Sequence, residues 1–230
     1  MIRSNAIPQP LTSTSLRVQV YDVLRDLLDQ GDLHGGEVFD LKSLSERLGV
    51  SRTPLREALL RLEVEGFVTI RPRSGVIVRP LTERDVRNLY QMIGALEASV
   101  LLSESDSLNE QVIADMRRWN EASKQALAGD DFAAYYTANL ALHNSYLNLS
   151  RNEELIHNVE IMKQRLYDFP RRRGFIREWE EASTGEHDAI VGWLEKGDAT
   201  AAAEVVRDVH WSFEVQERFI RMYYLEELES

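Results

Sequence analysis

The apolar positions follow two different spacings in the first third of the chain. Between residues 15 and 65 they recur at every third or fourth position, which is typical of amphipathic helices. Asp40 and Ser51 stand where N-caps belong, and Gly49 stands where a helix would end. The segments FVTIR and VIVR then show a spacing near two, separated by PRSG, which predicts a hairpin with a glycine-containing turn. Three helices followed by a hairpin predict a winged helix-turn-helix over residues 15–80.

The rest of the chain has helical spacing and no strand pattern. Leu89, Ile93 and Leu96 illustrate this repeat. We expect helices at about 82–104, 108–128, 131–149, 153–170, 175–195 and 199–227. The sequence therefore predicts a mainly α protein with three parts: a flexible arm (1–14), a winged helix (15–80) and an all-α antiparallel bundle of six to seven helices (81–230).

Charge is distributed unevenly between these parts. The chain has a net charge of −11, but residues 1–80 carry +1 and residues 81–230 carry −12. Between residues 42 and 79, eight basic residues stand against four acidic ones. Because charges are screened beyond a Debye length of ~8 Å, local charge decides whether a phosphate backbone is bound. We therefore expect a small nucleic-acid-binding module followed by a larger acidic domain.

The composition excludes several other classes of protein. The chain has no cysteine, which excludes disulfides, Cys-ligated zinc, iron–sulfur centres and a thiol nucleophile. It has no run of ~18 apolar residues. Its first residues contain no apolar stretch of signal-peptide length. We expect a cytoplasmic protein without a membrane segment.

The third predicted helix begins with residues suited to reading DNA. Arg52, Thr53 and Arg56 lie in its first two turns, where recognition helices contact bases. The two arginines are four residues apart and leave one helix face together, and each guanidinium can bind O6 and N7 of guanine. In the wing, phosphate or the minor groove would be contacted by Arg71, Arg73, Ser74 and Gly75. The alternative is a solvated basic helix whose arginines pair with Glu57, Glu63 and Glu65.

The segment SRTPLREAL, followed by LEVEGFV and a glycine-tipped wing, resembles the winged helix of GntR-type bacterial transcription regulators. The resemblance covers residues 15–80. It implies a symmetric homodimer that binds a palindromic double-stranded operator. It also implies operator contacts from Lys42, Arg52, Thr53 and Arg56, with Ser74 and Gly75 at the wing tip.

Polar side chains that can hold a metal are spread over three predicted helices. Asn139 and His143 are four residues apart and share a face, whereas His187 and His210 lie on later helices. One imidazole from each of three helices can converge inside a bundle, which suits a divalent transition metal such as Zn²⁺, Ni²⁺ or Mn²⁺. A lone buried histidine is more often a hydrogen-bonded core residue. Both interpretations stay open at this point.

The second part of the chain resembles the ligand-binding domain of the FadR subfamily of GntR regulators, called the FCD domain. The matching stretches are LYQMIGALEASVLL, NLALHNSYLNLSRNEEL and GEHDAIVGWLEKGDATAAAEVVRDVH. The resemblance implies that an aspartate and three histidines hold a metal, which in turn holds a small organic acid; His143 and His187 match that pattern. Asn139 replaces the carboxylate, and Ile93 replaces an arginine that often faces the ligand. His210 lies one residue late, a shift of ~100° around the helix unless the backbone compensates.

A basic and aromatic stretch, YDFPRRRGFIREW, interrupts the acidic domain. We predict that Arg172, Arg173 and Trp179 contact a small-molecule effector, with an arginine replacing the anchor that is absent at Ile93. The alternative is a solvated interhelical loop.

These features favour a ligand-responsive DNA-binding regulator, expected to be a repressor, and not an enzyme. The alternative is a helical metal-dependent hydrolase that uses His143, His187 and His210, with the winged helix as an accessory. Metal hydrolysis needs a positioned base, and the sequence has no H-E-x-x-H or comparable carboxylate-bearing motif. A third possibility is an effector-free architectural DNA binder, which requires a bundle without a cavity.

Overall fold

The computed structural model describes residues 16–29, 33, 35–71, 75–167 and 176–225. The predicted N-terminal arm lies outside these ranges. The chain divides into two compact units, Met1–Pro80 and Leu81–Ser230.

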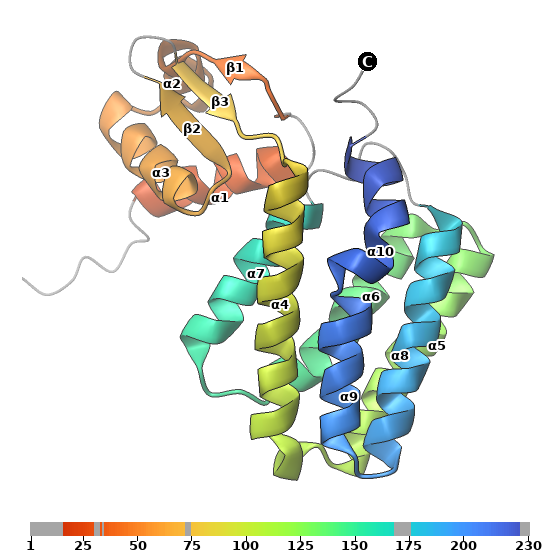
Figure 1. Ribbon diagram of the computed structural model, residues 1–230. Helices are drawn as coiled ribbons and strands as arrows, with labels where there is room; N and C mark the ends of the chain where they lie inside the picture. The colour runs from red at the N-terminus through yellow and green to blue at the C-terminus, as the bar shows by residue number, and fades with distance from the viewer. Residues whose placement is uncertain (1–15, 30–32, 34, 72–74, 168–175, 226–230) are drawn as a thin grey trace, which may run out of the picture. The chain divides into compact units, whose positions relative to one another are not determined.

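The described part of the first unit consists of helices and a small antiparallel sheet (Figure 1). Asp40 caps the second helix, because its carboxylate accepts hydrogen bonds from the main-chain N–H groups of Lys42 and Ser43. Gly49 ends that helix in the left-handed conformation, with φ of 64°. In chain order the elements are α1 (Leu16–Asp29), β1 (Val38–Phe39), α2 (Leu41–Leu48), α3 (Arg52–Val64), β2 (Val68–Arg71) and β3 (Gly75–Val78).

The sheet has the order β1-β3-β2, so the predicted hairpin of β2 and β3 has an additional strand beside β3. In the two antiparallel pairings, Val38 of β1 lies opposite Ile77, and Ile70 of β2 lies opposite Val76. The sequence analysis did not predict β1, because two residues are too few to show a spacing. Its pairing with β3 is what defines this strand.

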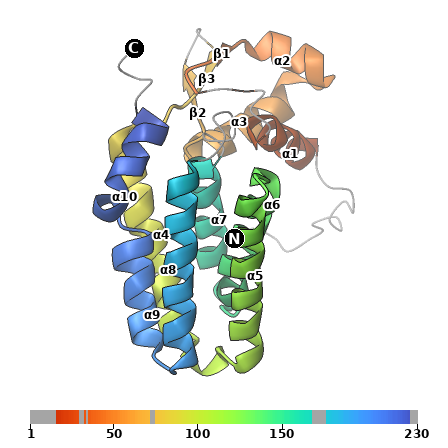
Figure 2. The same ribbon diagram turned by 90° about the vertical axis from the view of Figure 1, so that its right-hand side faces the viewer.

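The described part of the second unit is helical, and its helices pack side by side with roughly aligned axes (Figures 1 and 2). α4 packs against α7 and α9, and α5 packs against α6 and α8. The bounds are α4 (Glu83–Ser103), α5 (Glu110–Ala128), α6 (Phe132–Leu147), α7 (Glu153–Tyr167), α8 (Arg177–Glu195), α9 (Ala199–Val205) and α10 (Phe213–Ile220), with a 3₁₀ turn at Ser105–Ser107.

The first helix of this unit begins at a capping box formed by Thr82 and Asp85. Its apolar stripe, which includes Leu89 and Ile93, enters a core shared with residues such as Leu142 of α6. No helix among the described residues is both long and apolar enough to cross a bilayer. The predicted fold class, a winged helix followed by a helical bundle, is confirmed.

The prediction of one helix over residues 199–227 is wrong. α9 continues into a π-helical turn, η3 (Val206–His210), and the helix ends at Trp211. Ser212 then caps α10 by accepting a hydrogen bond from the main-chain N–H of Val215. A second π-helical turn, η4 (Arg221–Leu225), follows α10. The first of these π-helical turns, η3, contains His210 and determines where its side chain points.

Candidate DNA-binding surface and histidine-lined pocket

One face of α3 presents the predicted base-reading residues to solvent. Arg52, Thr53 and Arg56 are exposed, whereas Leu55 and Leu59 on the opposite face are fully buried. Neither Arg52 nor Arg56 forms an ion pair with any residue that the structure describes. Both guanidinium groups are therefore available to a ligand.

The glutamates that could have neutralised these arginines are engaged elsewhere. Glu65 pairs with Arg61 and accepts a hydrogen bond from the Tyr21 hydroxyl. Glu63 accepts one from the main-chain N–H of Ile70, at 2.7 Å. The alternative interpretation thus holds for Arg61, which pairs with Glu65, but not for Arg52 or Arg56, which pair with no described glutamate.

The remaining predicted DNA contacts lie on α2 and at the wing. Lys42 is exposed on α2, with its ammonium 3.9 Å from Glu46. Arg71 is exposed at the end of β2. Gly75 begins β3 at φ +97°, and a Cβ atom there would lie 2.6 Å from the carbonyl oxygen of Phe39, so no other residue fits without a shift of the backbone. Arg73 and Ser74 lie outside the described residues.

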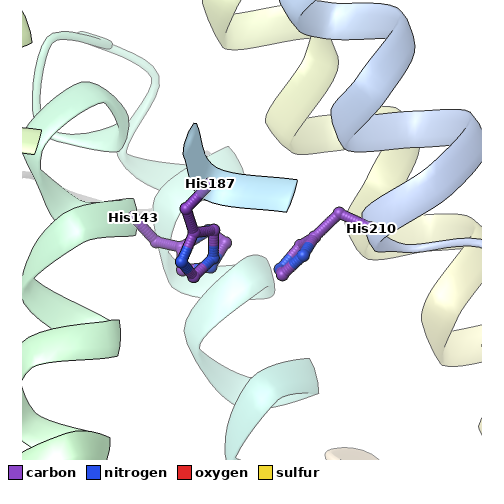
Figure 3. Close-up of side chains that lie close together, drawn as sticks. All are labelled: His143, His187 and His210. Carbon is purple, nitrogen blue, oxygen red and sulfur yellow. The ribbon is translucent and has the colours of Figure 1, made fainter. Parts of the chain in front are cut away.

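The second unit brings three histidines together from separate helical segments. His143 comes from α6, His187 from α8 and His210 from η3 (Figure 3). Their ring centroids are 4.8 to 5.2 Å apart, and one nitrogen of each ring lies within 4.8 Å of the others. All three side chains are buried. We call them the histidine cluster.

The π-helical turn brings His210 into this cluster. The main-chain N–H of Trp211 donates to the carbonyl oxygen of Val206, five residues earlier, at 2.9 Å. One extra residue is thereby absorbed in the turn. This is the backbone compensation that the late position of His210 in the sequence requires.

Each histidine is oriented by a hydrogen bond from its Nδ1. The acceptors are Glu97 for His143 (2.9 Å), the Asn120 amide oxygen for His187 (3.2 Å) and Glu186 for His210 (2.8 Å). The Asn120 nitrogen donates to Thr184 and Asp188, which identifies its oxygen as the acceptor for His187. Since all three partners accept, each Nδ1 carries a proton, and Nε2 of a neutral ring then has a free lone pair.

Three buried atoms of the cluster and of the neighbouring Asn139 have no hydrogen-bond partner among the described residues. These atoms are Nε2 of His143, Nε2 of His187 and Oδ1 of Asn139, which is one turn before His143 on α6. Burial lowers the pKa of His143 to about 4 and holds that of His187 well below its usual value. Neutral imidazoles with unused lone pairs, each held by an outer acceptor, are what a transition-metal site requires. The residues present fit a metal ion.

Glu97 connects the cluster to a buried lysine. One carboxylate oxygen accepts hydrogen bonds from His143, from the Tyr146 hydroxyl (2.5 Å) and from the Trp211 indole (2.9 Å). The other oxygen pairs with Lys163. Burial alone would raise the pKa of the Glu97 carboxyl, but His143 and the Lys163 ammonium outweigh it and hold the pKa well below its usual range. Glu97 is therefore an ionised, fully paired carboxylate in the core.

A cavity of about 70 Å³ lies beside the histidine cluster, and Asn139 and His210 are part of its wall. Most of the wall is aromatic, and Trp179, one of the predicted effector contacts, belongs to it. Its indole N–H donates to Gln216 at 2.8 Å, and its ring stacks on Phe219. Arg172 and Arg173 lie outside the described residues. A cavity of this volume can hold several water molecules. The bundle is therefore not fully packed, whereas the alternative of an effector-free architectural DNA binder requires a bundle without a cavity.

Ile93, expected from the resemblance to face the ligand, is fully buried in the core and does not line this cavity. The outer acceptors Glu97, Asn120 and Glu186 were not predicted from the sequence. Glu97 lies four residues after Ile93, on the apolar stripe of α4, and Asn120 lies four residues after the buried Met116 on α5. A polar residue at a position that the helical spacing assigns to the core was the available signal.

A winged helix whose Arg52 and Arg56 pair with no described residue, followed by a helical unit, defines the class of DNA-binding proteins with a separate helical domain. Residues 16–78 match the family described as bacterial regulatory proteins, gntR family, and residues 88–210 match the FCD domain. The chain belongs to the GntR family and carries an FCD domain. The family is described as one of regulatory proteins, in agreement with the expectation of a transcription regulator rather than an enzyme.

Individual relatives agree with this assignment. The chain is 33% identical to the Nta operon transcriptional regulator of Aminobacter aminovorans over 57% of its own length. The aligned part of this chain spans 62% of that regulator, and 61% of a second relative that is also 33% identical, an uncharacterized regulator of Agrobacterium vitis. It is 28% identical to a probable D-xylose utilization operon transcriptional repressor of Paenarthrobacter nicotinovorans, over 69% of this chain and 72% of that protein. The solved structure of Escherichia coli McbR/YncC shares the fold, with a TM-score of 0.67 at 21% identity, covering 94% of this chain and 100% of that one.

Proposed function

We propose that this protein is a ligand-responsive transcription regulator that binds a palindromic operator as a homodimer. The observation that carries the proposal is that Arg52 and Arg56, at the beginning of α3, are exposed and form no ion pair with any described residue. Two guanidinium groups on one face of a recognition helix can each bind a guanine in the major groove. Lys42 and Arg71, both exposed, would add phosphate contacts.

The helical unit would sense a metabolite with the help of a divalent transition metal such as Zn²⁺, Ni²⁺ or Mn²⁺. His143, His187 and His210 would hold the ion through Nε2, and Asn139 through its amide oxygen. The unpartnered buried atoms of the histidine cluster support this assignment. When bound, the ion would supply a positively charged coordination position for the effector at the wall of the cavity. Glu97, Asn120 and Glu186 would keep the imidazole lone pairs aimed inward.

Effector binding can change operator affinity only if the effector binds the DNA-bound and free arrangements with different affinities. Repression, relieved by the effector, is the direction we propose, and the relative described as a repressor supports it.

The experiment begins with selection of operator sequences from a random duplex library by the full-length protein. Binding of the selected duplex is then compared for the wild type, Arg52→Ala, Arg56→Ala and the control Arg218→Ala, whose side chain pairs with Glu178 in the helical unit. Each α3 substitution should weaken binding roughly 5- to 150-fold, equivalent to ~1–3 kcal/mol, without changing the fold. Undiminished operator affinity in both α3 variants would refute the proposal.

A further inference from the structure

The chemical character of the cavity wall indicates which effector it can bind. Its described lining includes several rings and two carboxylates, but no lysine or arginine. The rings belong to Tyr90, Phe132, Tyr135, Tyr136, Trp179, Trp211, Tyr223 and Tyr224. The carboxylates belong to Glu180 and Glu186. An anionic group placed against Glu180 and Glu186, away from the proposed metal position beside Asn139 and His210, would meet like charge.

The two carboxylates differ in how well they are satisfied. Glu186 accepts hydrogen bonds from His210 at 2.8 Å and from Gln216 at 2.7 Å, so both of its oxygens are engaged. Glu180 accepts one, from the hydroxyl of Tyr135. Its other oxygen, Oε1, receives none from any described residue, and no described cation pairs with it. Glu180 is therefore the carboxylate that can receive a donor from a bound molecule.

Burial raises the pKa of Glu180 to about 7, and the Tyr135 hydrogen bond and the nearby His210 only partly oppose this rise, so the charged form of the carboxyl is incompletely stabilised. A protonated amine would supply that stabilisation through a charge-assisted hydrogen bond. The faces of electron-rich rings attract the same kind of group, through cation–π interactions.

We propose that the effector carries a protonated amine, which binds in this cavity among the aromatic rings and against Glu180. The inference rests on the proposed function and names the class of its effector: a small amine, or a zwitterion whose carboxylate reaches the position beside Asn139 and His210. A cavity of about 70 Å³ suits a compact molecule of this kind rather than a long acyl chain.

The test uses matched pairs of probes with similar skeletons and opposite charge: benzylamine with benzoate, phenethylamine with 3-phenylpropionate, and butylamine with valerate. Binding to the full-length protein is measured by calorimetry and by indole fluorescence, since Trp179 and Trp211 line the cavity. The amines and carboxylates are compared in protein treated with a chelator, so that no carboxylate gains affinity from a bound ion. At least one amine should bind ten-fold or more tightly than its paired carboxylate. Glu180→Gln should abolish that preference. The control Glu178→Gln, an exposed residue two positions earlier on α8, should retain it.

Two results would overturn the inference. In the first, no amine binds more tightly than its carboxylate; carboxylate binding that is lost in Arg172→Ala or Arg173→Ala would point to an anionic effector instead. In the second, Glu180→Gln leaves the affinity for amines unchanged. Neither result touches operator binding, which the α3 substitutions test separately. Failure of the amine inference is therefore distinguishable from failure of the proposed function.

Discussion

The main-chain N–H of Trp211 bonds to the carbonyl oxygen of Val206, and this five-residue step places His210 beside His143 and His187. In a regular α-helix, each additional residue turns the residues after it by ~100° around the axis. One extra residue before position 210 would therefore move His210 off the face that points into the bundle. The π-helical turn holds that additional residue without moving the residues that follow.

We therefore predict that deletion of Asp208 preserves the histidine cluster. Asp208 is exposed and bonds only to its neighbour Arg207 among the described residues, so its removal should convert η3 to regular α-helix and leave His210 in place. Zinc stoichiometry by elemental analysis and the thermal midpoint should both stay close to wild type. Deletion of Thr137, an exposed residue of the regular helix α6, is the contrasting control, because no extra residue is available there. A folded Asp208 deletion that no longer binds zinc would contradict this account.

Local features of the fold could be predicted from the sequence because neighbouring residues determine them. Asp40 and Thr82 cap helices through hydrogen bonds that span three residues or fewer, and the buried stripe of α3 follows directly from its spacing. The strand β1 and the π-helical turn at Val206–His210 could not, because long-range pairing and packing determine them.

The same distinction applies to the candidate site. The base-reading face of α3 needs only one helix, so Arg52 and Arg56 could be placed from the sequence. The histidine cluster needs three segments to meet, and its outer acceptors come from α4, α5 and α8. The spacing of the chain indicates that Glu97 is buried, but only the packing of α4 against its neighbours shows which histidine it contacts.

The amide at position 139 makes metal affinity adjustable in a predictable direction. Asn139→Asp replaces an unpartnered buried oxygen by a carboxylate, which should raise zinc affinity at least ~10-fold through added negative charge. In the presence of a chelator the same variant should melt at a lower temperature than wild type, because the buried charge is then uncompensated. Competition with a fluorescent chelator measures the affinity. Asn144→Asp, exposed on the same helix, should change neither quantity; equal zinc affinities for Asn139→Asp and wild type would argue against coordination by residue 139.

The buried pair of Glu97 and Lys163 should behave as a coupled unit. Lys163→Met leaves the Glu97 carboxylate without its cation and should cost ~3–5 kcal/mol of unfolding free energy. Glu97→Gln combined with Lys163→Met removes both charges and should be less destabilising than the sum of the single changes. Urea denaturation of the four proteins gives the coupling energy. Additive effects within ~0.5 kcal/mol would mean that the two charges do not stabilise each other.

The raised pKa of Glu180 predicts a pH dependence of stability. Burial is the main cause of the rise from 4.5 to about 7, opposed by the Tyr135 hydrogen bond and by His210, while the nearby Tyr90 hydroxyl stays neutral. Between those two values the folded protein binds more protons at this site than the unfolded chain, so its stability falls as the pH rises from ~4.5 to ~7. The full loss is at most ~3.5 kcal/mol, because one pKa unit corresponds to ~1.4 kcal/mol.

Glu180→Gln removes this titration without changing the shape of the side chain. Urea denaturation at pH 5 should give similar unfolding free energies for the variant and the wild type, whereas at pH 8 the variant should be the more stable protein. Glu178→Gln, whose side chain is exposed and paired with Arg218, serves as the control and should show no such pH dependence relative to wild type. If the difference between Glu180→Gln and wild type were the same at both pH values, the buried carboxyl would not titrate in this range.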